Sequence, residues 1–262
     1  AAVGVAAALV LSIGAGATGI LKSASEAFAG VFGPTADTEV IDEIGRPIGA
    51  SDTVNGVTVT ADAILFDGYN YLISYTLEKE DGSSFGVQTN PDTNLLDLLW
   101  EDSTTDVGVR SGGFIGSSWF YDENPDDNAI QYVEMMTADT PIEPGTATAT
   151  FQNLYLRGKD IQDRTLLAEG KWKIRFQFDF PDSGVSLDAG QTFQLNGMEA
   201  TLDGVTLSPL SIQVDYTVHQ ELAWSEDRES GQINAHDREQ SYRYFESLPV
   251  VITYTDGTTQ DL

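Results

Sequence analysis

The sequence predicts an all-β protein with two immunoglobulin-like β-sandwich domains after an N-terminal apolar, transmembrane helix. Three observations lead to this prediction. The first 21 residues contain no charged side chain, apolar residues beyond them alternate with polar ones, and part of the alternating region recurs later in the chain. A period of two indicates strands that bury one face, and a repeat of this length indicates a duplicated domain.

The predicted organisation has four parts. Residues 1–22 form a transmembrane or signal segment, 23–37 a linker, 38–182 a first β-sandwich domain and 185–262 a second, smaller one. The chain of 262 residues is long enough for two domains. Its content of 41% hydrophobic residues is that of a protein with a core.

The run from Ala1 to Leu21 is long enough to cross a membrane. A helix of this length extends for about 30 Å, the thickness of a bilayer core. We therefore expect a single membrane anchor. A cleaved signal peptide is the alternative, because Ala27-Phe28-Ala29 has the small-x-small form of a cleavage site.

A dinucleotide fingerprint also falls in this run. Gly14, Gly16 and Gly19 match the pattern GxGxxG, and Asp42 follows about 20 residues later. The fingerprint requires a short strand before the glycines and further βα units after them. Here the apolar run is too long and strand-like alternation follows, so we do not expect a nucleotide site.

The linker is predicted from small, polar residues around Gly33-Pro34. Beyond it, the clearest strand has apolar residues on one face and charged or polar residues on the other. The apolar residues are Trp172, Ile174, Phe176, Phe178 and Phe180, and they alternate with Lys171, Lys173, Arg175, Gln177 and Asp179. Near the end of the chain, alternating residues followed by Asp256-Gly257 predict a hairpin.

The repeat appears when the chain is shifted so that Asn55-Gly56 falls on Asn196-Gly197. At the same offset, the pairs Thr60 and Thr201, Asp62 and Asp203, and Tyr75-Thr76 and Tyr216-Thr217 coincide. The apolar alternation slips by one residue just after the aspartate in both copies. A slip of one residue would turn the core face to solvent. We therefore predict a β-bulge or a strand break at each aspartate, whose carboxylate binds local backbone amides.

Four segments resemble a known family: NGVTV at 55–59, DGYNYLISY at 67–75, GKWKIRF at 170–176 and VTLSP at 205–209. They are similar to bacterial proteins of the domain-of-unknown-function family 4179. The resemblance implies a single-pass membrane protein of Gram-positive bacteria with extracytoplasmic sandwich domains, at residues 38–262. Some members of that family occur beside, or fused to, anti-sigma and sigma-factor signalling modules. The family supplies no catalytic residues.

Composition excludes several classes of function. The formal net charge of −28 argues against nucleic-acid binding, because cations are needed to displace phosphate counterions. The absence of Cys excludes disulfides, cysteine-ligated metals and thiol nucleophiles. Only His219 and His236 could serve a histidine-based site, and no GxSxG motif accompanies them. We expect both histidines at the surface.

One acidic loop is a candidate calcium site. Asp122, Glu123, Asp126 and Asp127 bring four carboxylates together between 122 and 128. Ca²⁺ prefers such oxygen ligands, but the spacing is not that of an EF-hand. In so acidic a chain we favour a plain polar loop. We expect no other cofactor.

Nearly half of the 13 cationic residues lie between 157 and 175, namely Arg157, Lys159, Arg164, Lys171, Lys173 and Arg175. The last three are expected to share the polar face of one strand. We favour pairing with acidic residues on neighbouring strands, and the alternative is a surface that binds an anion or a partner.

Three classes of function remain open. The leading interpretation is a non-catalytic extracytoplasmic module that senses or binds a protein or cell-envelope partner. The second is a surface adhesion or cell-wall-binding protein. The third is a hydrolase with an unrecognised acidic site. Trp100, Trp119 and Tyr121 are candidates for a carbohydrate platform, although such aromatic residues more often belong to a core or cover a hairpin.

Overall fold

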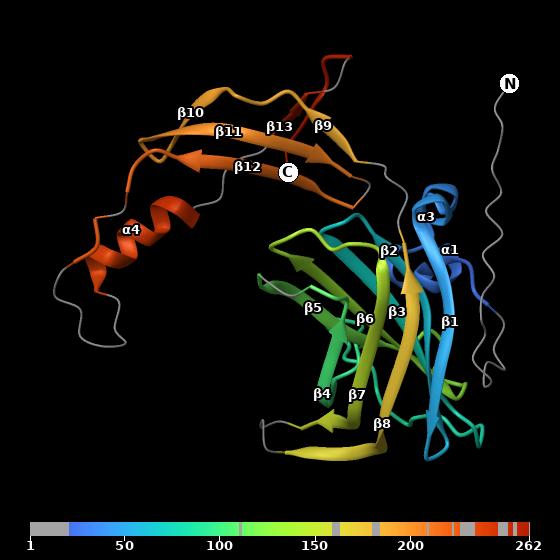
Figure 1. Cartoon of the computed structure of the whole chain (residues 1–262). Coiled ribbons are helices and arrows are strands. Elements are labelled where there is room, and N and C mark those ends of the chain that lie inside the picture. Colours follow the sequence, from blue (N-terminus) through green and yellow to red (C-terminus); the bar gives the residue numbers. More distant parts are fainter. Residues whose placement is uncertain are drawn as a thin grey trace, which may run out of the picture. The chain divides into compact units, whose positions relative to one another are not determined.

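The computed structural model describes residues 21–262 except 110–111, 159–162, 180–183, 209, 222, 226–233, 246–250, 254–255 and 262. The chain divides into two compact units, one ending at Ser183 and one running from Gly184 to Leu262 (Figure 1). Both units are built mainly from antiparallel strands, so the prediction of an all-β protein is confirmed.

The first unit contains two antiparallel sheets. The five-stranded sheet has the order β1-β2-β3-β6-β5, and its strands are β1 (Gly45–Val54), β2 (Val57–Phe66), β3 (Asn70–Lys79), β6 (Ala129–Ala138) and β5 (Phe114–Tyr121). The three-stranded sheet has the order β4-β7-β8, with β4 (Leu98–Asp106), β7 (Gly145–Arg157) and β8 (Arg164–Phe178). One hydrophobic core contains residues of both sheets.

Aromatic side chains join the two sheets across this core. The ring of Tyr75 from β3 meets Phe151 of β7 edge-on with ring centroids 5.0 Å apart, and Trp100 of β4 meets Tyr132 of β6 edge-on at 6.0 Å. Trp172 of β8 is fully buried and its Nε1 donates a hydrogen bond to the carbonyl of Val57 at 2.9 Å. Each of these strands therefore presents its aromatic face to the core, as the alternation predicts.

Two short helices, α1 (Ala24–Ala27) and α2 (Ala29–Phe32), lie in the segment 23–37 that was predicted to be a linker, and α3 (Thr38–Ile44) follows it. Ser23 and Glu26 cap α1 reciprocally, and Asp42 of α3 accepts hydrogen bonds from the backbone and hydroxyl of Ser25. Phe28 is fully buried. The segment is part of the first unit because its apolar side chains pack into it, although it is rich in residues typical of linkers.

Among the described residues, no helix is both long and apolar enough to cross a membrane. The anchor predicted at residues 1–21 and the glycine pattern within it lie outside the described residues, apart from Leu21. The anchor therefore stays a prediction.

The described residues of the second unit form one four-stranded sheet, one hairpin and one helix. In the sheet, β11 (Met198–Leu207) pairs with β10 (Thr192–Leu195), β12 (Ile212–Val218) and β9 (Val185–Leu187). The hairpin joins β13 (Val251–Thr253) to β14 (Thr259–Asp261), as Asp256-Gly257 predicts. The helix α4 (Ala235–Phe245) was not predicted. The described residues of this unit contain no second large sheet, which a sandwich would need.

The repeat corresponds to the same local structure in both units. The hairpins β2–β3 and β11–β12 have register irregularities between Ala61 and Ala63 and between Leu202 and Gly204. The predicted bulges are therefore present. The predicted role of the aspartates was wrong in one respect, because each carboxylate binds a threonine hydroxyl of the neighbouring strand and not a backbone amide: Thr76 donates to Asp62 and Thr217 donates to Asp203, both at 2.6 Å.

Candidate functional site

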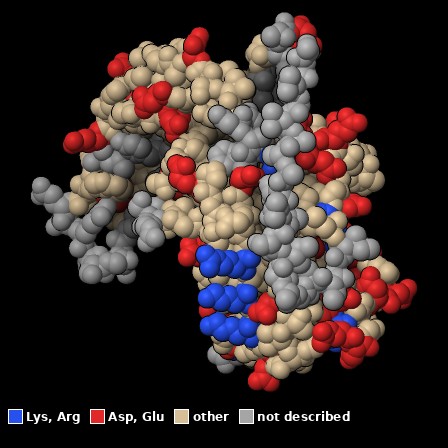
Figure 2. All heavy atoms as spheres, turned by 45° about the vertical axis from the view of Figure 1, so that its right-hand side comes forward, with Lys and Arg blue, Asp and Glu red and all other residues tan. Residues whose placement is uncertain are grey.

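Three cations form a row on the outer face of β8. Lys171, Lys173 and Arg175 alternate along this strand with the buried residues Trp172 and Ile174, so their side chains point to solvent. We call these three residues the basic ladder. Figure 2 shows a column of Lys and Arg side chains stacked one above another, which is the arrangement that alternate residues of one strand produce.

The neighbours of the basic ladder on β7 are uncharged. Lys171 lies opposite Gln152, Lys173 opposite Thr150 and Arg175 opposite Thr148. The expectation that acidic residues on the adjacent strand pair with these cations was therefore wrong. Within the described part of the chain, no ion pair involves any of the three. Other cations of the chain are paired, for example Arg46 with Asp179 at 3.0 Å and Arg164 with Glu101 at 3.7 Å.

Carboxylates surround the basic ladder without contacting its charged groups. On β4, Asp102 and Asp106 lie opposite Gln152 and Thr148 of β7, so one strand separates them from the ladder. On the other side, the carboxylate of Asp52 accepts a hydrogen bond from the backbone N–H of Lys173 at 2.8 Å. The result is a narrow positive strip with acidic borders.

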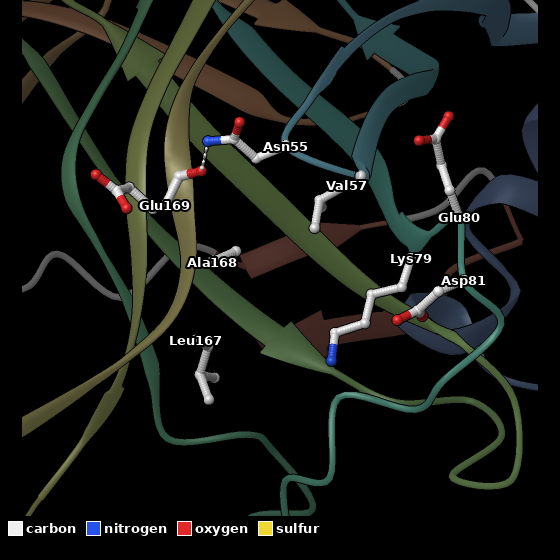
Figure 3. Close-up of a pocket in the computed structure, with 9 residues that line it drawn as sticks. Asn55, Val57, Lys79, Glu80, Asp81, Leu167, Ala168 and Glu169 are labelled. Atoms are coloured by element: carbon white, nitrogen blue, oxygen red, sulfur yellow. Dashed lines mark hydrogen bonds between the residues drawn. The ribbon is translucent and has the colours of Figure 1, made fainter.

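A pocket of about 800 Å³ lies where the turn between β1 and β2, at Asn55-Gly56, approaches the first half of β8 (Figure 3). Two of its polar side chains bind neighbouring backbone carbonyls. The side-chain amide of Asn55 donates to the carbonyl of Glu169 at 2.9 Å, and Lys79 Nζ donates to the carbonyl of Ser84 at 3.1 Å. Lys79 also lies 4.9 Å from the centroid of the Phe85 ring. These contacts fix the turn and hold Lys79 on the wall of the pocket, beside the carboxylates of Glu80 and Glu169.

The candidate calcium loop uses its carboxylates to shape the backbone. Asp122 accepts a hydrogen bond from the backbone N–H of Asn124 at 2.9 Å, and Asp127 accepts one from Ala129 at 2.8 Å. Burial raises the pKa of Asp122. Across the described residues, no group of three or more acidic or histidine side chains is placed to hold a metal ion, so Glu123 and Asp126 are not brought into a ligand set with the other two.

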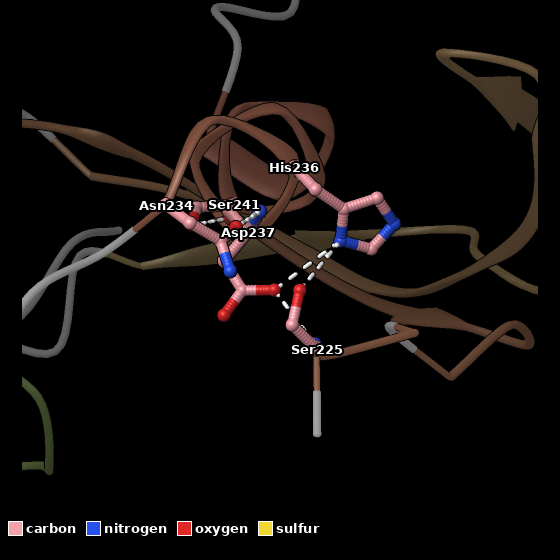
Figure 4. Close-up of polar contacts among 5 residues, drawn as sticks. All are labelled: Ser225, Asn234, His236, Asp237 and Ser241. Atoms are coloured by element: carbon pink, nitrogen blue, oxygen red, sulfur yellow. Dashed lines mark hydrogen bonds and ion pairs between the residues drawn. The ribbon is translucent and has the colours of Figure 1, made fainter. Parts of the chain in front are cut away.

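Ser225, His236 and Asp237 lie close together at the start of α4 (Figure 4). The same nitrogen of His236, Nδ1, lies 3.4 Å from the Ser225 hydroxyl and 3.3 Å from the Asp237 carboxylate. A catalytic triad instead uses the two ring nitrogens for two different partners. Asn234 accepts a hydrogen bond from the backbone of Asp237, and the Asp237 carboxylate accepts one from the backbone of Ser225. The cluster therefore caps a helix and fastens a loop.

His219 is exposed, as expected, and its Nε2 lies 2.6 Å from the hydroxyl of Thr201 on the adjacent strand. The aromatic platform is not formed. Trp100 and Tyr121 are buried, and Trp119 lies on the face of its sheet opposite to Phe120.

One buried carboxylate was missed by the sequence analysis. Glu134 of β6 faces the core, where it accepts hydrogen bonds from Tyr71 at 3.0 Å and Thr105 at 2.6 Å. Burial raises the pKa of Glu134, although both hydrogen bonds act in the opposite direction. The signal was an acidic residue at a core position of an alternating strand. Both oxygens have hydroxyl partners, so this group ties β3, β4 and β6 together.

Comparisons with known proteins give little further information. No family model and no curated protein matches the chain. One solved structure, described as a conserved domain protein from Bacillus anthracis, is similar with a TM-score of 0.45 and 18% sequence identity. The similarity covers 66% of this chain and 54% of that chain, so this chain spans about half the length of that protein.

Proposed function

We propose that the chain is a non-catalytic binding module that takes an anionic partner on the outer face of the sheet β4-β7-β8. The observation that carries this proposal is the basic ladder, whose three cations are exposed and have neutral polar neighbours on β7. Unpaired cations beside hydroxyl and amide groups are the usual ligands of anionic groups in proteins. They are also concentrated on one strand of a chain whose net charge is −28.

We further propose that this module is extracytoplasmic and is held to a bacterial membrane by residues 1–21. The charge-free run at those positions supports this part of the proposal, as does the resemblance to family 4179. The two facing antiparallel sheets of the first unit, with Trp172 buried between them, support an immunoglobulin-like sandwich as its architecture. Sensing and partner binding would then take place outside the cell.

The binding proposal is tested by chromatography of the full chain on phosphocellulose at pH 7 and low salt. A protein of charge −28 should flow through this anionic resin. We expect partial retention, which the substitution K171Q/K173Q/R175Q abolishes. The control R157Q/R164Q/R238Q removes the same number of positive charges elsewhere and should be retained like the unsubstituted chain. Flow-through of all three proteins, or equal behaviour of the two variants, would contradict the proposal.

A further inference from the structure

We infer that the ligand of the basic ladder is a short stretch of a linear phosphodiester polymer without bases, extended along β8 with successive phosphates on Lys171, Lys173 and Arg175. This inference rests on the proposed function and names the chemistry of its ligand. Four features of the sheet lead to it: the spacing of the cations, the width of the positive strip, its length, and the neutral groups beside it.

The spacing of the cations sets the repeat of the ligand. Alternate residues of an antiparallel strand are about 7 Å apart, and the three cations occupy alternate positions of β8. Two residues of extended peptide, which contain six backbone bonds, span about 7 Å. A phosphodiester chain with three carbons between its phosphates also has six backbone bonds in each repeat, so its charges match the ladder one for one.

The width of the strip limits the ligand to a single chain. Neighbouring strands are about 4.8 Å apart, so Asp102 and Asp106 on β4 lie about two strand spacings from the ladder. Asp52 borders it on the side of β1. A polyanion wider than one chain, such as a DNA duplex, or a flat surface such as an anionic membrane would bring its charges against these carboxylates. A single extended chain would not.

The length of the strip is also bounded. Glu169 precedes the ladder, and Asp179, which is paired with Arg46 at 3.0 Å, follows it; both acidic residues are exposed. The strip therefore accommodates about three anionic groups before the next acidic side chain. A longer polymer must leave the surface at both ends, so added repeats should not add affinity in proportion.

The neutral groups beside the ladder favour a phosphodiester over a peptide or a nucleic acid. Thr148 and Thr150 of β7 add hydroxyl groups in a row parallel to the ladder, whereas the side-chain amide of Gln152 donates to the carboxylate of Glu101 at 3.3 Å. Hydroxyl groups commonly bind phosphate oxygens together with Lys and Arg. Opposite this row, β4 contributes Asp102, Thr104 and Asp106, so this part of the face has no aromatic ring for a base and no apolar pocket for a peptide side chain.

The test is titration of the full chain, in a nonionic detergent, with fluorescently labelled oligomers of six repeats. The probes are glycerol phosphate hexamer, inorganic hexaphosphate, hexaglutamate and the single-stranded DNA dT6. We expect the glycerol phosphate hexamer to bind most tightly. Three phosphates release about two counterions, so a fourfold increase in salt should weaken binding about 16-fold. The variant K171Q/K173Q/R175Q should not bind, and R157Q/R164Q/R238Q should bind normally.

The outcomes separate this inference from the proposed function. Tighter binding of hexaglutamate or of dT6 would overturn the phosphodiester assignment in favour of an acidic peptide or a nucleic acid, and binding of hexaphosphate as tight as that of the glycerol phosphate hexamer would overturn the spacing argument. If no oligomer binds through the ladder while phosphocellulose still retains the chain through it, the inference fails and the proposed function stands. Loss of both would refute both. Equal melting temperatures of the three proteins exclude a folding defect.

Discussion

The hairpins β2–β3 and β11–β12 share a sequence pattern and a backbone but not an environment. Each begins at an Asn-Gly turn with positive φ at both residues, 50° and 78° at Asn55-Gly56 and 48° and 77° at Asn196-Gly197. Each continues through a bulge at an aspartate that binds a threonine hydroxyl. Among the described residues, helices pack on the outer face of the first hairpin. In that hairpin Lys22 pairs with Asp62 at 3.6 Å, whereas Asp203 is exposed.

The outer faces of the two hairpins explain this difference. At equivalent positions, the first hairpin has Leu65 and Leu72, which are buried, and the second has Thr206 and Gln213. The helices α1 and α3 contact β2 of the first hairpin, where the Cβ of Ala24 and the side chain of Leu65 both approach Gly45. The comparison teaches that turn and bulge residues determine the hairpin itself, while the residues of its outer face determine whether another segment packs on it.

The helices that pack on the outer face of the first hairpin are called the cover here. The largest effect should follow from removing the N-terminal part of this cover. A chain that begins at Thr38 lacks α1, α2 and the fully buried Phe28. Removing one buried Phe side chain costs about 3–5 kcal/mol, and Leu65 and Leu72 would also become exposed. We expect the first unit to unfold or aggregate, as measured by size-exclusion chromatography and thermal unfolding. A chain that begins at Leu21 keeps the cover and is the control. Equal melting temperatures of the two chains would show that the cover contributes no stability.

The second prediction compares the aromatic residues at the centres of the two hairpins. Tyr75 is fully buried against Phe151, whereas Tyr216 is half-buried with its ring 5.8 Å from Phe193. Tyr75→Ala should therefore lower the unfolding free energy of its unit by about 3–5 kcal/mol, and Tyr216→Ala by clearly less. Hydrogen exchange, resolved by peptide, measures the two units separately. The variants Tyr75→Phe and Tyr216→Phe keep the rings and should cost little. Equal losses on substitution by Ala would mean that the two cores are equivalent.

The third prediction concerns the turns, where the two hairpins should behave alike. An alanine in the left-handed region costs about 1–2 kcal/mol. The position of a Cβ at Gly56 is 4.0 Å from its nearest neighbour, and at Gly197 nothing lies within 4 Å. Gly56→Ala and Gly197→Ala should therefore each lower the unfolding free energy by the same amount, through the backbone alone. A loss at only one of the two sites, measured by the same hydrogen exchange, would show that the turns are not equivalent.

Particular residues show how far the sequence could predict this molecule. The Asn-Gly turns and the shifted alternation predicted both hairpins with their bulges, because turn geometry and strand period are local properties. The cover was missed because its first two helices have only four residues each and no periodicity, although Ser23 and Glu26 carry the pattern of a capping box. Alternation placed Lys171, Lys173 and Arg175 on one face. Their lack of acidic partners depends on the register of β7 and β8, which shifts beyond Gln152 and cannot be derived from either strand alone.

The smallest expected effect is a pH dependence of stability that comes from Asp62. Burial raises the pKa of Asp62, although Lys22 and Thr76 act against this shift. Because the native pKa is above the unfolded value near 3.8, the native state binds the proton first as the pH falls. The unfolding free energy should therefore rise as the pH drops through the native pKa and stop rising below about 3.8.

Asp62→Asn should remove this rise, and the matched control Asp203→Asn should leave it unchanged. Both variants keep an oxygen that accepts the threonine hydroxyl, so the comparison isolates the charge. Urea unfolding of the first unit between pH 7 and pH 3 measures the effect, and an unchanged slope in Asp62→Asn would show that ionised Asp62 is as stable in the folded chain as in the unfolded one.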